Sequence, residues 1–154
     1  MKRVWIALVL AACGSAPPPA TTPVTVVETG SRSNAAPVTL AAHSLWTGRY
    51  ECAQGITGLV LTLDLDASGR ASAVFDFGPV PENPNIPSGR YLMNGSFVPS
   101  TLGTELTLVP DRWIAQPPGY LMVGLTGHVD AAARTLAGRV DHPSCSVMSL
   151  VRTQ

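Results

Sequence analysis

The residue types most able to do chemistry gather near the end of the chain, in Asp141–Cys145, which reads DHPSC. An acid, an imidazole and a thiol within five residues resemble the parts of a cysteine nucleophile and its base. Such partners usually come from distant parts of a chain, and a thiol held in a disulfide cannot attack a substrate. We therefore expect no catalytic site here. The prediction depends on how Cys13, Cys52 and Cys145, the three cysteines of the chain, are used.

A second candidate is the stretch Asp64–Gly69, DLDASG, which matches the first half of a calcium-binding loop. The match fails at the twelfth position, where Phe75 replaces the bidentate glutamate that such a loop needs, so a tight hairpin turn explains it better. His43 and His128 do not complete a set of imidazole ligands. The sequence also lacks a glycine-rich phosphate loop and a nucleophile elbow. We expect no metal and no cofactor.

The first residues have the order of an export signal. A basic start, Met1–Arg3, precedes the apolar run Val4–Leu10 and then the small residues Ala11 and Ala12. The apolar run is far short of the roughly 20 residues that a spanning helix requires. We therefore interpret residues 1–12 as a signal peptide rather than a membrane span.

The four residues LAAC, Leu10 to Cys13, resemble the lipobox of bacterial lipoproteins. The resemblance implies that the peptide before Cys13 is removed and that this cysteine carries a thioether-linked diacylglycerol and an acylated amino group. Since two acyl chains already give stable anchoring, three should hold the protein on a membrane permanently. By the same resemblance, Gly14 after the cysteine favours the outer membrane of a two-membrane bacterium.

Lipidation of Cys13 would leave two cysteines, in an exported domain that meets an oxidising compartment. We therefore predict a disulfide between Cys52 and Cys145, near the two ends of the folded part of the chain. In the chain-entropy model, closing so long a loop contributes about 4 kcal/mol to stability.

Composition points to strands and turns. The formal charge is zero, with ten basic and ten acidic residues, which makes nucleic acid an unexpected partner. Charged residues make up only 13% of the chain, and 14 glycines and 14 prolines disfavour long amphipathic helices. Residues 13–43 are rich in Pro, Ala and Thr and cannot bury a core, so we interpret them as the lipidated cysteine followed by a disordered tether.

Residues 44–154 show repeated alternation of apolar and polar residues, which indicates half-buried strands. We predict an all-β domain: an antiparallel meander of about eight strands, closed as a small barrel or, alternatively, folded as a β-sandwich. Glycines at inward positions would let the strands bend tightly. These are Gly48, Gly95, Gly127 and Gly138.

Two proline-rich stretches are too long for plain hairpin turns. They are residues 78–89, GPVPENPNIPSG, and residues 110–120, PDRWIAQPPGY. Because proline restricts the backbone, we expect ordered loops that form a rim, with Trp113, Ile114 and Tyr120 as ligand-binding residues. The alternative is that Trp113 plugs one end of the barrel.

The strings WTGRYECAQGITGL, NPNIPSGRYLMNG and WIAQPPGYLMVGLTG resemble a small domain of unknown activity that occurs in exported bacterial proteins. This resemblance covers most of residues 45–152 and implies no catalytic residue. Lipocalin-like and avidin-like barrels place glycine before tryptophan in the first strand, whereas here Trp46 precedes Gly48.

These observations predict a lipid-anchored envelope protein that is not an enzyme and that binds a partner through its loop rim. A small apolar molecule, a glycan and another envelope protein all remain open as partners. Two alternatives also remain: a secreted hydrolase that uses His142 with a nearby Ser or Cys, and a structural or assembly subunit of the envelope.

Overall fold

The computed structural model describes residues 40–100, 103–130 and 132–154. The predicted signal peptide, the lipidation of Cys13 and the tether as far as residue 39 lie outside the described residues. In the described part of the chain, no helix has the length and hydrophobicity needed to cross a membrane.

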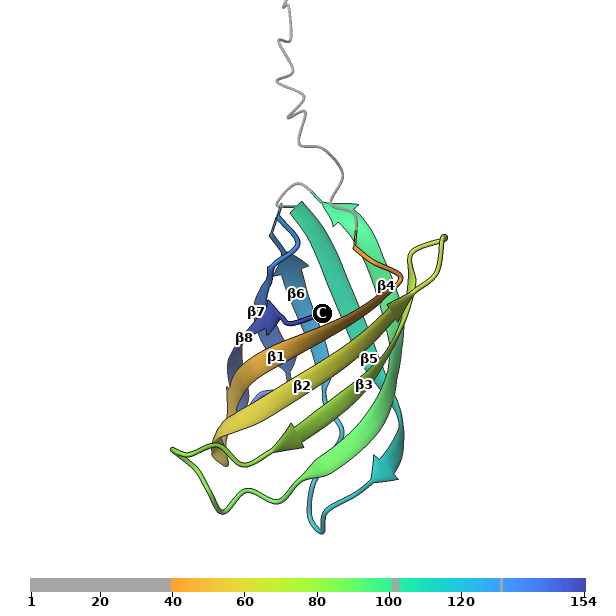
Figure 1. The fold of residues 1–154 in the computed structure, drawn as a ribbon. Helices are drawn as coiled ribbons and strands as arrows, with labels where there is room; N and C mark the ends of the chain where they lie inside the picture. The colour runs from red at the N-terminus through yellow and green to blue at the C-terminus, as the bar shows by residue number, and fades with distance from the viewer. Residues whose placement is uncertain (1–39, 101–102, 131) are drawn as a thin grey trace, which may run out of the picture. The chain divides into compact units, whose positions relative to one another are not determined.

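Eight antiparallel strands follow one another around a closed barrel, and the last pairs with the first (Figure 1). This confirms the predicted all-β meander and selects the barrel over the sandwich. The strands are β1 (His43–Cys52), β2 (Gly55–Leu65), β3 (Arg70–Gly78), β4 (Gly89–Ser100), β5 (Gly103–Ala115), β6 (Gly124–Val129), β7 (Thr135–Asp141) and β8 (Cys145–Arg152).

Alternate residues of each strand point inward and build one core, as the two-residue periodicity predicts. Glycine is required where two strands approach most closely. A β-carbon on Gly95 would lie 1.8 Å from the carbonyl oxygen of Thr107, and one on Gly48 would lie 2.1 Å from that of Ser149. These positions are filled by neighbouring backbone, so no side chain fits there.

The prediction of a loop from Pro110 to Tyr120 is wrong for its first half, because β5 continues to Ala115. The pairing of β4 with β5 shifts register twice around Tyr91, and these bulges allow Pro110 to lie in the strand without a backbone N–H to donate. The loop therefore spans only residues 116–123, and β6 begins at Gly124. The other predicted loop is confirmed, since β3 ends at Gly78 and β4 begins at Gly89.

The barrel has two ends that differ in construction. We call the end formed by the β1–β2, β3–β4, β5–β6 and β7–β8 connections the mouth, which lies at the bottom of Figure 1. We call the other end the base. It carries the β2–β3 and β6–β7 turns, and the described chain begins beside it, where the Leu65 N–H donates to the Ala42 carbonyl at 2.8 Å.

Candidate ligand site at the mouth of the barrel

A cavity of about 420 Å³ opens at the mouth. This volume lies within the range of small-molecule sites. Its wall combines inward side chains from the mouth half of the strands with residues of three connections. The lining residues are Tyr50, Cys52, Ala53, Gln54, Phe75, Phe77, Tyr91, Gly119, Tyr120, Leu121, Val123, His142, Ser144 and Cys145.

Aromatic rings form the inner wall of this cavity. Phe75 stacks on Tyr91 with ring centroids 4.7 Å apart, and meets Tyr50 edge to face at 5.6 Å. Nearer the loop, Phe77 stacks on Tyr120 at 5.5 Å. Phe75 and Tyr91 meet because they face each other across the pairing of β3 with β4. The result is a continuous apolar surface of fixed ring planes.

Of the three predicted rim residues, the structure brings only Tyr120 to the cavity. Trp113 packs edge to face on Tyr91 at 5.1 Å and on Phe77 at 6.4 Å, so it contacts two rings of the aromatic wall without lining the cavity. Ile114 is 53% exposed and is not part of the cavity wall. The sequence alone did not show which side of the strand each of these residues would face, because the bulges in β5 change the alternation there.

The β5–β6 loop is held on the cavity by Tyr91. The Tyr91 hydroxyl donates to the carbonyl of Val123 at 2.9 Å and accepts from the Val123 N–H at 3.3 Å. Burial raises the pKa of this phenol above its ordinary value, so it stays a neutral donor. Within the loop, the side-chain amide of Gln116 donates to the Tyr120 carbonyl at 3.1 Å. Leu121, at the edge of the mouth cavity, is 72% exposed.

Elsewhere at the mouth, Asn83 joins the long β3–β4 loop to the β1–β2 turn. Its side-chain amide donates to the carbonyls of Gln54 at 2.8 Å and Ile56 at 3.2 Å. The Gln54 side chain donates in turn to the Thr57 hydroxyl at 3.4 Å. Sequence reasoning missed Asn83, because nothing in NPNIP distinguishes a structural asparagine from an ordinary loop residue.

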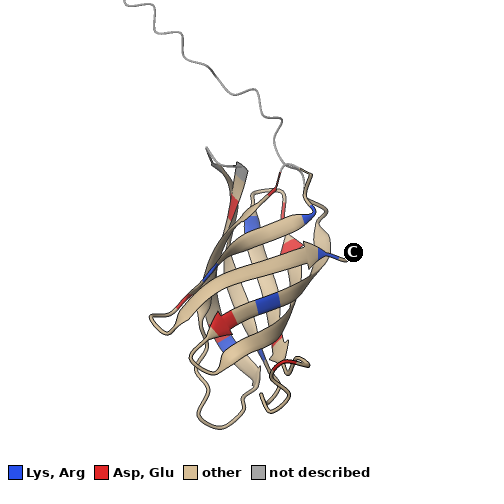
Figure 2. Cartoon of the chain, turned by 90° about the vertical axis from the view of Figure 1, so that its left-hand side faces the viewer, with Lys and Arg blue, Asp and Glu red and all other residues tan. Residues whose placement is uncertain are grey.

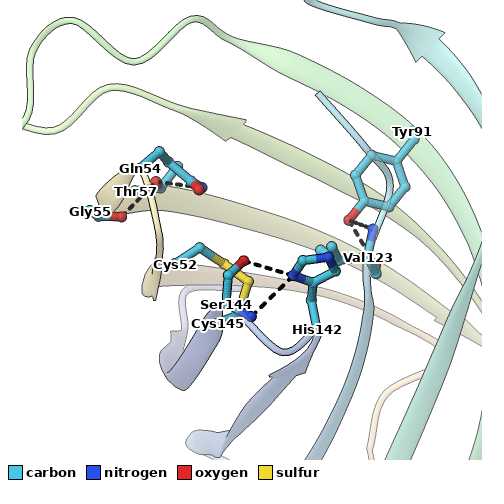
Figure 3. Close-up of a disulfide and its surroundings, with 9 residues drawn as sticks. All are labelled: Cys52, Gln54, Gly55, Thr57, Tyr91, Val123, His142, Ser144 and Cys145. Carbon is cyan, nitrogen blue, oxygen red and sulfur yellow. Dashed lines mark hydrogen bonds between the residues drawn. A yellow bond between two sulfur atoms is a disulfide. The ribbon is translucent and has the colours of Figure 1, made fainter. Parts of the chain in front are cut away.

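The predicted disulfide between Cys52 and Cys145 is present (Figure 3). These cysteines face each other across the pairing of β1 with β8, at the point where β1 ends and β8 begins. The bond therefore closes the seam of the barrel at the mouth, and both cysteines line the cavity.

Beside the disulfide, His142 and Ser144 form a tight turn in which the imidazole Nδ1 lies 2.7 Å from the Ser144 hydroxyl (Figure 3). The backbone N–H of Ser144 also donates to Nδ1, at 3.2 Å. Nδ1 is thus an acceptor, and in the neutral ring the proton lies on Nε2.

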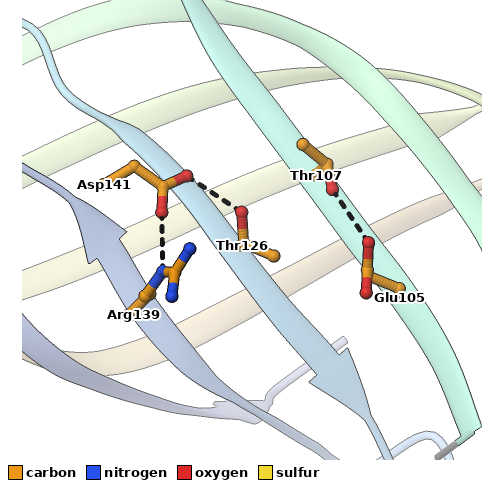
Figure 4. A network of polar contacts seen from close by, with 5 residues as sticks. All are labelled: Glu105, Thr107, Thr126, Arg139 and Asp141. Atoms are coloured by element: carbon orange, nitrogen blue, oxygen red, sulfur yellow. Dashed lines mark hydrogen bonds and ion pairs between the residues drawn. The ribbon is translucent and has the colours of Figure 1, made fainter.

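For hydrolysis, a third group would have to orient this imidazole. Asp141 precedes His142, but its carboxylate oxygens take the Thr126 hydroxyl at 2.9 Å and the Arg139 guanidinium at 3.1 Å (Figure 4). Asp141 is thus engaged elsewhere and does not contact the imidazole of His142. Cys145 is not a free thiol.

None of the residues in the cavity wall is Lys, Arg, Asp or Glu. Burial raises the pKa of the Tyr50 phenol to about 12, while its neighbours Thr57 and Gln54 lower it by less, so this group also stays neutral. In the mouth connections, Glu82 is the one carboxylate, and it pairs with Arg49 at 3.0 Å. Figure 2 shows that basic and acidic residues are few and scattered over the described barrel.

No set of three His, Cys, Asp or Glu side chains that could hold a metal ion occurs among the described residues. The fold and the cavity define an up-and-down antiparallel β-barrel with an opening of ligand size at one end. Comparison of the chain with protein-family models, with curated proteins and with solved structures finds no match.

Proposed function

We propose that this protein is a lipid-anchored bacterial envelope protein that binds a small molecule in the mouth cavity. The observation that carries the proposal is the combination of an aromatic wall, a lining without Lys, Arg, Asp or Glu, and a volume of about 420 Å³ at one end of a barrel with a packed core. A filled interior with a flat rim would favour a purely structural subunit instead.

Two features support the anchored location. The LAAC sequence up to Cys13 resembles a lipobox, and the disulfide between Cys52 and Cys145 fits an oxidising compartment outside the cytoplasm. The described chain begins beside the base, at the end of the barrel away from the mouth. Gly14 favours the outer membrane by the same resemblance.

Mass spectrometry of the chain purified from the bacterium that makes it tests the anchor. We expect a mature chain that begins at Cys13 and carries the mass of three acyl chains, and we expect Cys13→Ser to abolish that mass. A full-length, unmodified chain that still begins at Met1 would overturn this half of the proposal.

Ligand binding is tested on the mature chain without its lipidated cysteine, from Gly14 onward, exported so that the disulfide forms. The probe is N-phenyl-1-naphthylamine, a neutral aromatic molecule whose fluorescence rises in apolar sites. We expect saturable binding, weakened about tenfold or more by Ala53→Trp, since Ala53 is an exposed turn residue on the cavity wall. Ala67→Trp, in the β2–β3 turn at the base, is the matched control. Equal binding by both variants would show that the probe does not bind in the mouth cavity.

The hydrolase alternative is favoured by one observation, the 2.7 Å contact between His142 and Ser144. An activated serine would react with a fluorophosphonate, so labelling of Ser144 that is lost in His142→Ala would support the alternative. We expect no labelling, because no acid orients the imidazole in the described residues.

A further inference from the structure

The wall of the mouth cavity carries two kinds of group, and they define the class of molecule that fits. The first kind is aromatic: the rings of Tyr50, Phe75, Phe77, Tyr91 and Tyr120. The second kind is polar: Gln54 from the β1–β2 turn, and His142 with Ser144 from the β7–β8 turn. Figure 3 shows these two turns next to the disulfide, with Tyr91 on another strand beyond His142.

Three ion pairs lie on the outer wall of the barrel near the mouth. Arg49 pairs with Glu82, Arg90 with Asp76, and Arg139 with Asp141. None of these six side chains lines the cavity. A charged ligand would therefore lose its hydration without meeting an opposite charge, which is costly. A neutral ligand does not have this cost.

The hydrogen bond that His142 can make to a ligand is limited to one direction, in which the imidazole donates. The Nδ1 of His142 already accepts from the Ser144 backbone and lies 2.7 Å from the Ser144 hydroxyl. The remaining ring nitrogen of the neutral imidazole, Nε2, carries the proton and is a donor. A ligand group that meets it must accept a hydrogen bond, as a carbonyl, an ether or a hydroxyl oxygen does.

We propose that the mouth cavity takes a neutral molecule with a flat, ring-containing body and one hydrogen-bond-accepting end. The body lies against Phe75, Tyr91 and Tyr120, and the accepting end meets His142. This inference rests on the proposed function, because it specifies the ligand of the same cavity.

The first test compares two probes with the same ring system. N-Phenyl-1-naphthylamine is neutral, and 1-anilinonaphthalene-8-sulfonate adds one negative charge. We expect the mature chain to bind the sulfonate at least about tenfold more weakly. If the sulfonate binds as tightly as the neutral probe, the neutral class is wrong while binding at the mouth stands. If neither probe binds, the proposed function itself fails.

The second test addresses the accepting end. A propionyl-dimethylaminonaphthalene is also neutral, and its ketone accepts a hydrogen bond, which N-phenyl-1-naphthylamine cannot do well. His142→Phe should lower the ratio of ketone-probe affinity to N-phenyl-1-naphthylamine affinity by about three- to tenfold. His128→Phe, on the outer face of β6, should leave both affinities unchanged. An unchanged ratio in His142→Phe would overturn the assignment of His142, and the use of a ratio corrects for any general loosening of the mouth.

Discussion

The mouth and the base of this barrel carry hollows of similar size and different chemistry. The hollow at the base has a volume of about 440 Å³, against about 420 Å³ at the mouth. Its wall includes only one aromatic residue, Phe97, together with the carboxylate of Asp66 and small turn residues. Volume alone therefore does not mark a ligand site. The mouth is distinguished by its aromatic wall and by the absence of Lys, Arg, Asp and Glu from its lining.

The two ends also differ in how their connections are held. At the base, each described turn is closed by its own carboxylate: Asp66 accepts from the Ser68 and Arg70 N–H groups, and Asp130 from those of Arg134 and Thr135. At the mouth, the β5–β6 loop is also held by Tyr91, and the β3–β4 loop by the contacts of Asn83 with the β1–β2 turn. Local turn chemistry shapes the base, whereas long-range contacts shape the candidate site.

The largest difference between the ends should appear on truncating an aromatic residue at each. Trp46 lies fully buried in the base half of the core, and its indole N–H donates to Ser44 at 3.0 Å. Trp46→Ala should lower the free energy of unfolding by about 3–5 kcal/mol, because it leaves a large cavity. Tyr120→Ala, at the mouth, should cost less than about 1.5 kcal/mol and mainly reduce probe binding.

Chemical denaturation monitored by circular dichroism measures both changes, and titration with N-phenyl-1-naphthylamine measures the second. Similar losses of stability in the two variants, with probe binding intact in Tyr120→Ala, would show that the ends do not divide these roles.

The part of the fold that follows from local pattern could be predicted from the sequence. In β2, buried and less buried residues alternate without interruption, and the inward side chains include Leu59, Leu61 and Leu63. The inward face of this strand could therefore be predicted from the sequence. The inward position of Gly95 followed in the same way. The course of β5 could not be predicted in this way, because a bulge inserts an extra residue and the alternation of the sequence does not indicate where.

The second largest effect should come from the disulfide, which joins the seam at the mouth only. Reduction, or the double change Cys52→Ser with Cys145→Ser, should lower the free energy of unfolding by about 2–4 kcal/mol. It should also weaken probe binding, since both cysteines line the cavity. Urea unfolding with and without a reducing agent measures the stability. The serine variant is the control, because a reducing agent should not change it further.

The candidate site was predicted only in part, for a physical reason. The disulfide followed from the number and compartment of the cysteines, and Tyr120 from its place in a proline-rich loop. The roles of Asn83 and Tyr91 depend on hydrogen bonds to distant backbone. Such bonds are fixed by the closed barrel and leave no local signal in the sequence.

An intermediate effect is expected from Asn83, the long-range contact that holds one lip of the mouth. Asn83→Ala removes the donor from two backbone carbonyls and should cost about 1–2 kcal/mol of unfolding free energy. Asn85→Ala, an exposed change in the same loop, should stay within about 0.5 kcal/mol. Equal effects in the two variants would mean that the β3–β4 loop is not fastened through Asn83.

The smallest effect should be the acid sensitivity of the turns at the base. The hydrogen bond from the Ser68 side chain is the main cause that lowers the pKa of Asp66, and the Arg134 N–H does the same for Asp130. Because each pKa is lower in the folded chain than in the unfolded one, the stabilisation is present above the unfolded pKa, about 3.9, and is lost as pH falls below it.

Amide exchange measured between pH 5 and pH 3 should therefore show faster opening at Ser68 and Arg70 as the carboxyl of Asp66 is protonated. Asp66→Asn should remove this dependence. Glu82, at the mouth, also has a lowered pKa, caused first by its own backbone N–H and then by Arg49, so Glu82→Gln is the matched control. Glu82→Gln should leave exchange in the β2–β3 turn unchanged. If it instead abolished the acid response of that turn, the carboxylates of the two ends would not act independently.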